Sequence, residues 1–283
     1  MLDLYISNKN AIVGLESALR IAISNANNFN TPGYKYTFST FTTMYTEAIS
    51  SGTDVTNPLE TGSGMTMGAT STDFSQGNIS IGTELDVAIT GEGFFILSSS
   101  ASEFDQNSTN VFSRAGSFQL DSSATYIVDD FGRKVYGFPV DSSGNITSTV
   151  PEPIQTNGMT DIAFEDGGTL VGNATSATPT PLYKLALTTF QNKEGLISTS
   201  GGAYKNSIAS GTRFEAGTAG EALATGSSTT YGDILSNSLE ASNVDIAKVA
   251  LDMNLLNRGF AAVQAVIDDV TKILTEIIKK LGG

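Results

Sequence analysis

Carboxylates are the side chains in this sequence with the most capacity for chemistry, and several occur close together. Glu84 and Asp86 flank Leu85, so both would point to one face of a strand. A glycosidase needs two carboxylates at a fixed separation in a cleft. No other catalytic group surrounds this pair, and a solvated acidic strand face is the plainer interpretation. We interpret Asp129 and Asp130 in the same way, as surface charges.

The residue types that are missing narrow the chemistry further. The 283 residues include no cysteine and no histidine. Their absence removes disulfides, zinc sites built from Cys or His, cysteine nucleophiles and Ser-His-Asp triads. An enzyme would have to rely on carboxylate, lysine or tyrosine groups. We therefore expect no catalytic residue, no cofactor and no metal ion, and a carboxylate-based hydrolase is the third-ranked interpretation.

The distribution of charge bears on the partners of the protein. Asp and Glu number 29 against 15 Lys and Arg, which gives a formal net charge of −14. Proteins that bind nucleic acid usually carry a basic patch. In this sequence no Lys or Arg occurs between Lys35 and Arg114. No apolar run approaches the roughly 20 residues that span a bilayer, and Met1 to Asn10 lack the pattern of a cleaved signal. We expect no nucleic acid binding, no membrane insertion and no cleaved secretory signal.

The first elements that could position an assembly site are helices at the two ends. Apolar residues at heptad spacing predict a helix over about 2–28, with Tyr5, Ile12, Leu19 and Ala26 seven apart and Leu15 and Ala22 between them. Asn, Pro and Gly residues at 27–33 end it.

The C-terminal pattern is longer and more regular. Apolar residues are spaced three and four apart at Ile246, Val249, Met253, Leu256, Phe260, Val263, Ile267, Val270, Leu274, Ile277 and Leu281. This repeat predicts a coiled-coil helix roughly 54 Å long. Ser242, Asn243 and Asp245 precede it and can cap its first turn.

The middle of the chain has β character. Short apolar runs such as Phe94-Phe95-Ile96-Leu97 are typical of buried strands, and a further strand is expected over 182–190. We predict an α+β fold in which residues 1–35 and 235–283 form a discontinuous helical coiled-coil domain. Residues 36–234 would form a β-rich core, with Gly, Ser and Thr-rich loops at about 168–180 and 207–230.

A long apolar face cannot remain in water, so the two helices should pair. Because the C-terminal repeat is longer than its N-terminal counterpart, part of it should contact other subunits. The predicted assembly interface consists of Ile12, Leu15, Leu19, Ile246, Val249, Met253, Leu256, Phe260, Val263, Ile267, Val270 and Leu274.

Several motifs along the chain resemble those of one known protein family. Residues 24–35 (SNANNFNTPGYK) are similar to the family pattern NNLANVNTPGYK, and 73–78, 84–89 and 91–95 are similar to its central block. Residues 112–118 resemble YTRxGxF, 239–245 resemble LExSNVD, and 257–260 resemble QRxF. The residues that carry the resemblance are Asn28, Asn30, Thr31, Pro32, Gly33, Tyr34, Gly91, Gly93, Phe94, Phe95, Ser242, Asn243, Val244, Asp245 and Arg258. The family that they resemble is the flagellar rod and hook axial proteins of bacteria.

The resemblance implies a structural subunit that polymerises into a helical tube, the rod or hook of the flagellum, and transmits motor torque. It implies export by the flagellar type III apparatus, terminal helices that line the tube, and an outer shell of β-domains. The implied partners are further copies of the chain, other rod, hook and junction proteins, and the export apparatus.

The sequence departs from the family in a few positions, with Ala26-Asn27 where Leu-Ala is usual and Asn257 where Gln is usual. The length of 37–62 resembles the distal rod, whereas 73–77 and 136–139 look more like the hook. Rod and hook therefore both stay open. A secreted fibre or surface adhesin with coiled-coil ends is the alternative outside this family.

Overall fold

The computed structural model describes residues 2–43, 46–50, 59–62, 64–98, 110–159, 161–221 and 230–281, with backbone alone for 2–5, 46–50, 59–62 and 281. Contacts between residues divide the chain into two compact units. The helical unit contains Met1–Phe29, Tyr36–Asp73 and Val244–Gly283, and the β unit contains Asn30–Lys35 and Phe74–Asn243. Each unit is described by itself.

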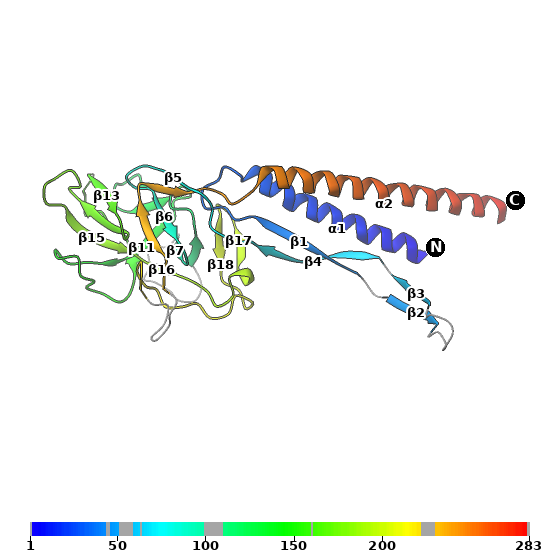
Figure 1. Ribbon diagram of the computed structural model, residues 1–283, viewed down its shortest axis with the longest axis horizontal. Helices are drawn as coiled ribbons and strands as arrows, with labels where there is room; N and C mark the ends of the chain where they lie inside the picture. The colour runs from blue at the N-terminus through cyan, green and yellow to red at the C-terminus, as the bar shows by residue number, and fades with distance from the viewer. Residues whose placement is uncertain are drawn as a thin grey trace. The chain divides into compact units, whose positions relative to one another are not determined.

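Two long helices and a β-ribbon make up the helical unit (Figure 1). The helices are α1 (Leu2–Asn27) and α2 (Ile246–Leu281), as the apolar repeats predicted, and they contact each other. The strands are β1 (Thr37–Thr43), β2 (Thr46–Ser50), β3 (Leu59–Gly62) and β4 (Met65–Thr72). β1 pairs antiparallel with β4, β2 pairs antiparallel with β3, and α1 contacts both β1 and β4.

The predicted capping of α2 is confirmed in detail for one residue. Asp245 Oδ1 accepts hydrogen bonds from the backbone N–H of Ala247 at 2.8 Å and of Lys248 at 3.3 Å. These two N–H groups have no partner within the helix, and the carboxylate also suits the positive end of the helix dipole. The start of α2 is therefore set by a local, sequence-encoded contact.

The buried face of α1 differs from the predicted one. Ala11, Leu15, Ala18, Ala22 and Asn25 are buried, at spacings of four and three residues. Leu15 and Ala22 were predicted on this face, but Ile12 and Leu19 lie beside it and are only partly buried. Alanines occupy the buried face of α1 because neighbouring elements, including β4, approach too closely for larger side chains. A Cβ on Gly14 would lie 3.1 Å from the backbone nitrogen of Met67.

The β unit is built on one antiparallel sheet, which has 12 strands in the part of the chain that the structure describes. Its main path runs β13-β14-β15-β11-β7-β8-β18-β17, and β9, β10, β12 and β16 join beside it. The strands of this sheet are β7 (Phe94–Ser98), β8 (Asn110–Ser113), β9 (Phe118–Leu120), β10 (Ile127–Asp129), β11 (Lys134–Pro139), β12 (Glu152–Pro153), β13 (Ile162–Glu165), β14 (Thr169–Gly172), β15 (Thr180–Leu185), β16 (Leu187–Thr188), β17 (Ile197–Thr199) and β18 (Ala203–Lys205).

Two small strand pairs complete the β unit. β6 (Val87–Thr90) pairs with β19 (Asp233–Ser236), and β5 (Ile79–Ile81) pairs with β20 (Ser238–Glu240). A 3-10 turn, η1, covers Lys193–Gly195. Both pairs join a segment that enters the β unit to one that leaves it, so they hold the two ends of this unit together.

The core lies on both faces of β7. Phe95 and Leu97 belong to one cluster of buried residues, and Phe94 and Ile96 to a second. Successive side chains of a strand point to opposite faces, so a strand covered on both sides must be apolar throughout. The prediction of a buried strand over this run is confirmed.

Other sequence predictions are corrected by the structure. Residues 36–73 belong with the helices rather than with the β-rich core, because their ribbon contacts α1. The predicted loop at 168–180 contains β14, and the strand expected over 182–190 is divided into β15 and β16. Of the predicted loop at 207–230, residues 222–229 lie outside the described residues.

Candidate functional site

The inner stripe of α2 is the set of apolar residues predicted from the C-terminal repeat. Val249 and Val270 are buried, and the residues between and after them are partly buried: Met253, Leu256, Phe260, Val263, Ile267 and Leu274. The first predicted member, Ile246, remains 47% exposed, and Ile277 remains 42% exposed. The stripe thus lies on the side of α2 that packs within the helical unit, and its partial burial leaves apolar area uncovered in one chain.

A second apolar stripe on α2 was missed by the sequence analysis. Its members Leu251, Leu255, Val266 and Ile273 are between 44% and 70% exposed, and Ile277 of the predicted repeat, 42% exposed, continues it. The positions recur after 11 residues, from 251 to 262 and 273 and from 255 to 266 and 277. An 11-residue period keeps side chains on one face of a helix for three turns. This outer stripe could have been found by testing that period beside the heptad.

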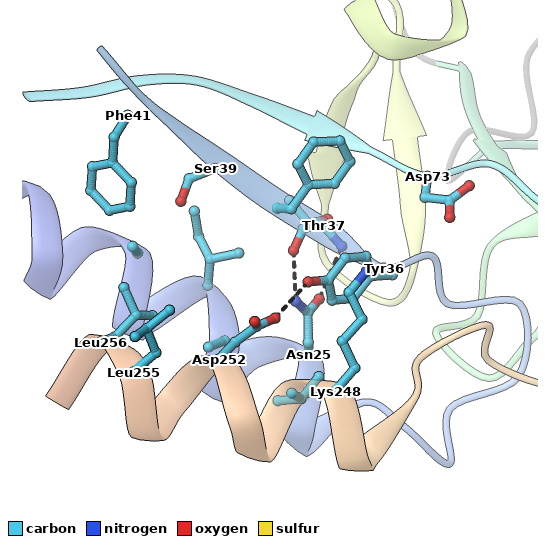
Figure 2. A pocket seen from close by; sticks show the side chains of 15 residues that line it. Asn25, Tyr36, Thr37, Ser39, Phe41, Asp73, Lys248, Asp252, Leu255 and Leu256 are labelled. Carbon is cyan, nitrogen blue, oxygen red and sulfur yellow. Dashed lines mark hydrogen bonds between the residues drawn. The ribbon is translucent and has the colours of Figure 1, made fainter. Parts of the chain in front are cut away.

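A groove of about 410 Å³ opens in the helical unit between α1, α2 and β1 (Figure 2). Apolar side chains from all three elements line it, including Ile21, Phe38, Phe41, Leu255 and Leu256. Leu255 also belongs to the outer stripe, so the groove and that stripe form one continuous apolar surface. Phe38 and Phe41 are 40% and 38% exposed. Exposed apolar patches of this kind are typical of sites that bind other chains.

The polar end of the groove is held by a few specific contacts. The hydroxyl of Tyr36 donates a hydrogen bond to Asp252 Oδ2 at 3.0 Å, and Lys248 Nζ lies 4.5 Å from the centre of the Tyr36 ring (Figure 2). Asn25 Nδ2 donates to the carbonyl of Thr37 at 2.6 Å, and Asn25 Oδ1 accepts from the Thr37 N–H at 3.0 Å. These bonds join β1 to both helices and fix the wall of the groove.

Burial and the neighbouring Asp252 change the pKa of Tyr36. Desolvation, the hydrogen bond to Asp252 and the negative charge of that carboxylate together raise the pKa of Tyr36 to about 12, and desolvation is the largest of these causes. The phenol therefore stays protonated at neutral pH and acts as a hydrogen-bond donor. The hydrogen bond from this phenol to Asp252 positions the wall of the groove.

The motif residues in the helical unit have structural roles. Asn28 Nδ2 donates to the carbonyl of Ser24 at 2.8 Å at the end of α1, and Asp245 caps α2. Arg258 is exposed on α2, and Val244 leads into that helix. These residues begin and end helices rather than meet in one site.

Most of the remaining motif residues meet inside the β unit. The turn over Asn30, Thr31 and Pro32 closes with a bond from the Tyr34 N–H to the Thr31 carbonyl, and the chain then passes close to 240–243. Gly91 and Gly93 precede Phe94 and Phe95 of β7, and Ser242 and Asn243 end the unit. The sequence analysis missed the residues that join these motifs, Lys35, Arg114 and Glu240, all of which are buried. Their charge within motifs that are mostly neutral was the available signal.

Gly33 shows why one of these motifs contains glycine. Its φ of +67° is in the left-handed region, and a Cβ would lie 2.3 Å from the backbone nitrogen of Ala115. Any larger residue would suffer both backbone strain and a clash with a backbone atom that has no freedom to move. The glycine thus permits residues 30–35 to lie against the segment around Arg114.

The acidic residues considered for catalysis have local roles instead. Asp86 is buried in a turn, where its Oδ2 accepts hydrogen bonds from the Thr83 N–H at 2.6 Å and hydroxyl at 2.9 Å. Both it and Glu84 precede β6, so the predicted acidic strand face is wrong. Asp129 is also buried rather than on the surface, and it pairs with Arg133 at 2.5 Å. Among the described residues, no group of three or more acidic side chains could hold a metal ion.

Comparison with known proteins gives matches along nearly the whole chain. The flagellar basal-body rod protein FlgG of Bacillus subtilis (strain 168) is 27% identical over 275 residues, which cover 93% of this chain and 93% of that protein. FlgG of Agrobacterium fabrum is 26% identical over 275 residues, 94% of each chain. The flagellar hook protein FlgE of Helicobacter pylori (strain ATCC 700392 / 26695) is 33% identical over 129 residues, 43% of this chain and 17% of that protein. No family model matches the chain.

The protein has a helical unit made from both ends of the chain and a mainly β unit whose sequence lies between them. Apolar side chains on α2 remain exposed. The matches to rod proteins extend over both units, in agreement with the motif resemblance. The chain belongs to the family of flagellar rod and hook proteins. Within the described residues, neither helix has a stretch apolar and long enough for a membrane span.

Proposed function

We propose that this protein is a structural subunit of the flagellar rod that polymerises into a helical tube and transmits torque. The observation that carries the proposal is the pair of apolar stripes on α2, one facing α1 and one facing outward. A single chain covers the inner stripe only in part and leaves the outer stripe largely exposed. Burial of each large apolar side chain contributes roughly 1.5–3 kcal/mol before entropy costs, so covering the outer stripe favours association.

We propose the rod rather than the hook because of the share of each protein's length that the match includes. The rod proteins match this chain and are matched by it over more than nine tenths of their length. The hook proteins of Helicobacter pylori and Escherichia coli match 43% and 48% of this chain and are themselves covered over 17% and 32%. A hook subunit is the second candidate, because the hook match has the higher identity, 33%.

In the proposed assembly, α1 and α2 form a coiled coil along the tube and the outer stripe contacts the same unit of neighbouring copies. A contact between two different faces generates an open helical polymer when its rotation does not close into a ring. The β unit would form the outer part, and other rod, hook and junction proteins would be the neighbours at each end. Export through the flagellar apparatus and the absence of enzymatic activity are parts of the same proposal.

The test uses an exposed member of the outer stripe and its neighbour on the same helix. Leu255→Asp should leave the chain folded, since 68% of the side chain is exposed, and should prevent polymerisation. Asn254→Asp adds the same charge one position away, on another face of α2, and should assemble like the wild type. Sedimentation velocity and negative-stain electron microscopy of the full chain measure both outcomes.

A second measurement tests the location directly. Isolated hook–basal bodies from the source cells should contain the wild-type chain in the rod and should lack the Leu255→Asp variant. Finding the wild-type chain in the hook would favour the second candidate. Its absence from the whole structure, or normal assembly of Leu255→Asp, would contradict the proposal.

A further inference from the structure

Three charged residues from distant parts of the sequence meet inside the β unit. Lys35 Nζ lies 2.6 Å from Glu240 Oε1, and Arg114 Nε lies 3.2 Å from Glu240 Oε2. The side chains of Lys35 and Glu240 are 0% exposed, and that of Arg114 is 5% exposed. One carboxylate therefore pairs with two cations where water has almost no access.

Backbone carbonyls accept further hydrogen bonds from the two cations. Lys35 Nζ donates to the carbonyl of Ser75 at 2.7 Å. Arg114 Nη1 donates to the carbonyls of Gly91 at 2.9 Å and Gly93 at 2.8 Å. Because these oxygens carry partial negative charge, they offset the second cation of the cluster. Each cation thus has several acceptors, as burial of charge requires, whereas Glu240 Oε2 contacts Arg114 as an ion pair without a hydrogen bond.

The cluster lies where the chain passes between the two units. These passages follow Phe29, Lys35, Asp73 and Asn243. The three segments of the β unit next to them are therefore 30–35, 74–77 and 240–243. All three contribute to the cluster or to the hydrogen bonds around it.

The surrounding backbone bonds tie these segments to one another. The Gly33 N–H donates to the carbonyl of Glu240 at 2.7 Å, and the Gly77 N–H donates to Glu240 Oε1 at 2.9 Å. The Asn243 N–H donates to the carbonyl of Tyr34 at 3.3 Å, and Asn243 Nδ2 donates to the carbonyl of Ser75 at 3.1 Å. Each segment is bonded to both of the others, with Glu240 at the centre.

Buried ion pairs add little net stability compared with well-packed apolar residues, but losing one partner is costly. Only one arrangement of the three segments brings all the charges together, whereas apolar side chains tolerate several. We propose that Lys35, Arg114 and Glu240 form a clamp that fixes the ends of the β unit in one arrangement. This role is distinct from stabilising the sheet, and it is independent of the proposed function.

The experiment is amide hydrogen exchange on the full-length monomer, resolved at single residues. Glu240→Gln keeps the shape of the side chain but leaves two buried cations without a carboxylate. We expect exchange at the N–H groups of Gly33, Gly77 and Asn243 to become at least about tenfold faster. The N–H groups of Ile96 and Phe112, which lie in the sheet, should accelerate only by the factor that the measured loss of overall stability sets. Unchanged exchange at the first three would overturn the proposal.

A triple variant separates the clamp from overall stability. Lys35→Met, Arg114→Met and Glu240→Gln together remove all three charges while keeping similar volumes. We expect the unfolding midpoint to return close to the wild-type value while Gly33, Gly77 and Asn243 still exchange at least about tenfold faster. Recovery of both stability and protection would show that only charge balance matters and would overturn the proposal.

The control is an ion pair of the same unit away from these segments. Asp129 and Arg133 have side chains only 7% and 12% exposed. Asp129→Asn should destabilise its own turn and leave exchange at Gly33, Gly77 and Asn243 unchanged. Equal acceleration there would mean that general destabilisation explains the result, against the clamp. If Glu240→Gln fails to fold, Lys35→Met replaces it in the experiment, because this variant leaves the Arg114–Glu240 pair intact. Lys35→Met should give the same faster exchange at Gly33, Gly77 and Asn243.

Discussion

At the scale of single residues, the motifs of this chain are explained by turns and close backbone contacts. Asp245 caps α2, Asn25 joins α1 to β1, and Gly33 lets one segment lie against another. None of these residues forms a catalytic group with its neighbours. Their identities follow from backbone geometry that other side chains satisfy poorly.

A comparison of Gly33 with Gly132 separates the energetic cost of backbone strain from the cost of a steric clash. Gly33 and Gly132 have similar φ values of +67° and +73°, but nothing lies within 4 Å of a Cβ on Gly132. Alanine at either position should cost roughly 1–2 kcal/mol for the left-handed backbone. Gly33→Ala should lose a further 1–3 kcal/mol or so, because its Cβ meets the backbone of Ala115. Urea denaturation of both variants measures the difference, and equal losses would refute the steric explanation.

At the scale of elements, α1 shows how neighbours decide which face of a helix is buried. Its predicted heptad series placed Ile12 and Leu19 on the buried face. The structure buries Ala11 and Ala18 instead. Small residues permit close approach of a second element, and hydrophobic spacing alone carries no information about that distance.

The face of α1 can be tested by adding volume to one alanine. Ala11 is 7% exposed, so Ala11→Leu should overpack its surroundings and lower the free energy of unfolding by roughly 1–3 kcal/mol. Ala261→Leu makes the same change at an exposed position of α2 and should alter stability by no more than about 0.5 kcal/mol. Denaturation of the monomer gives both values. If Ala11→Leu is neutral, the assigned face is incorrect.

At the scale of the whole molecule, the boundary of the β unit depends on contacts between its two ends. The predicted core of 36–234 excludes Lys35 and Glu240 and stops inside β19, whose four residues pair with β6. Residues 30–243 include all of these elements. The domain boundary is thus set by pairing between distant segments, which the change in composition along the chain indicated only approximately.

Two fragments test this boundary. Residues 30–243 should unfold cooperatively, whereas 36–234 should be less stable by roughly 3–5 kcal/mol or more, because Arg114 is left buried without its carboxylate. Urea denaturation followed by tyrosine fluorescence is suitable, since the chain has nine tyrosines and no tryptophan. Equal stability of the two fragments would show that the ends contribute nothing to the β unit.

The α+β class, both terminal helices, the cap of α2 and the buried strand β7 could all be predicted from the sequence. The sequence also identified the protein family through its motifs. These features depend on local periodicity, helix-end chemistry and short apolar runs, all of which are visible within a few turns or one strand.

Only the tertiary structure decided which face of α1 is buried, that residues 36–73 join the helices, and that Lys35, Arg114 and Glu240 meet. It also showed the outer stripe of α2 to be exposed. Each of these depends on distances between segments far apart in the sequence. A charged residue in a motif has the same local pattern whether it faces water or a buried partner, and only the packed chain brings that partner within 3.2 Å or less.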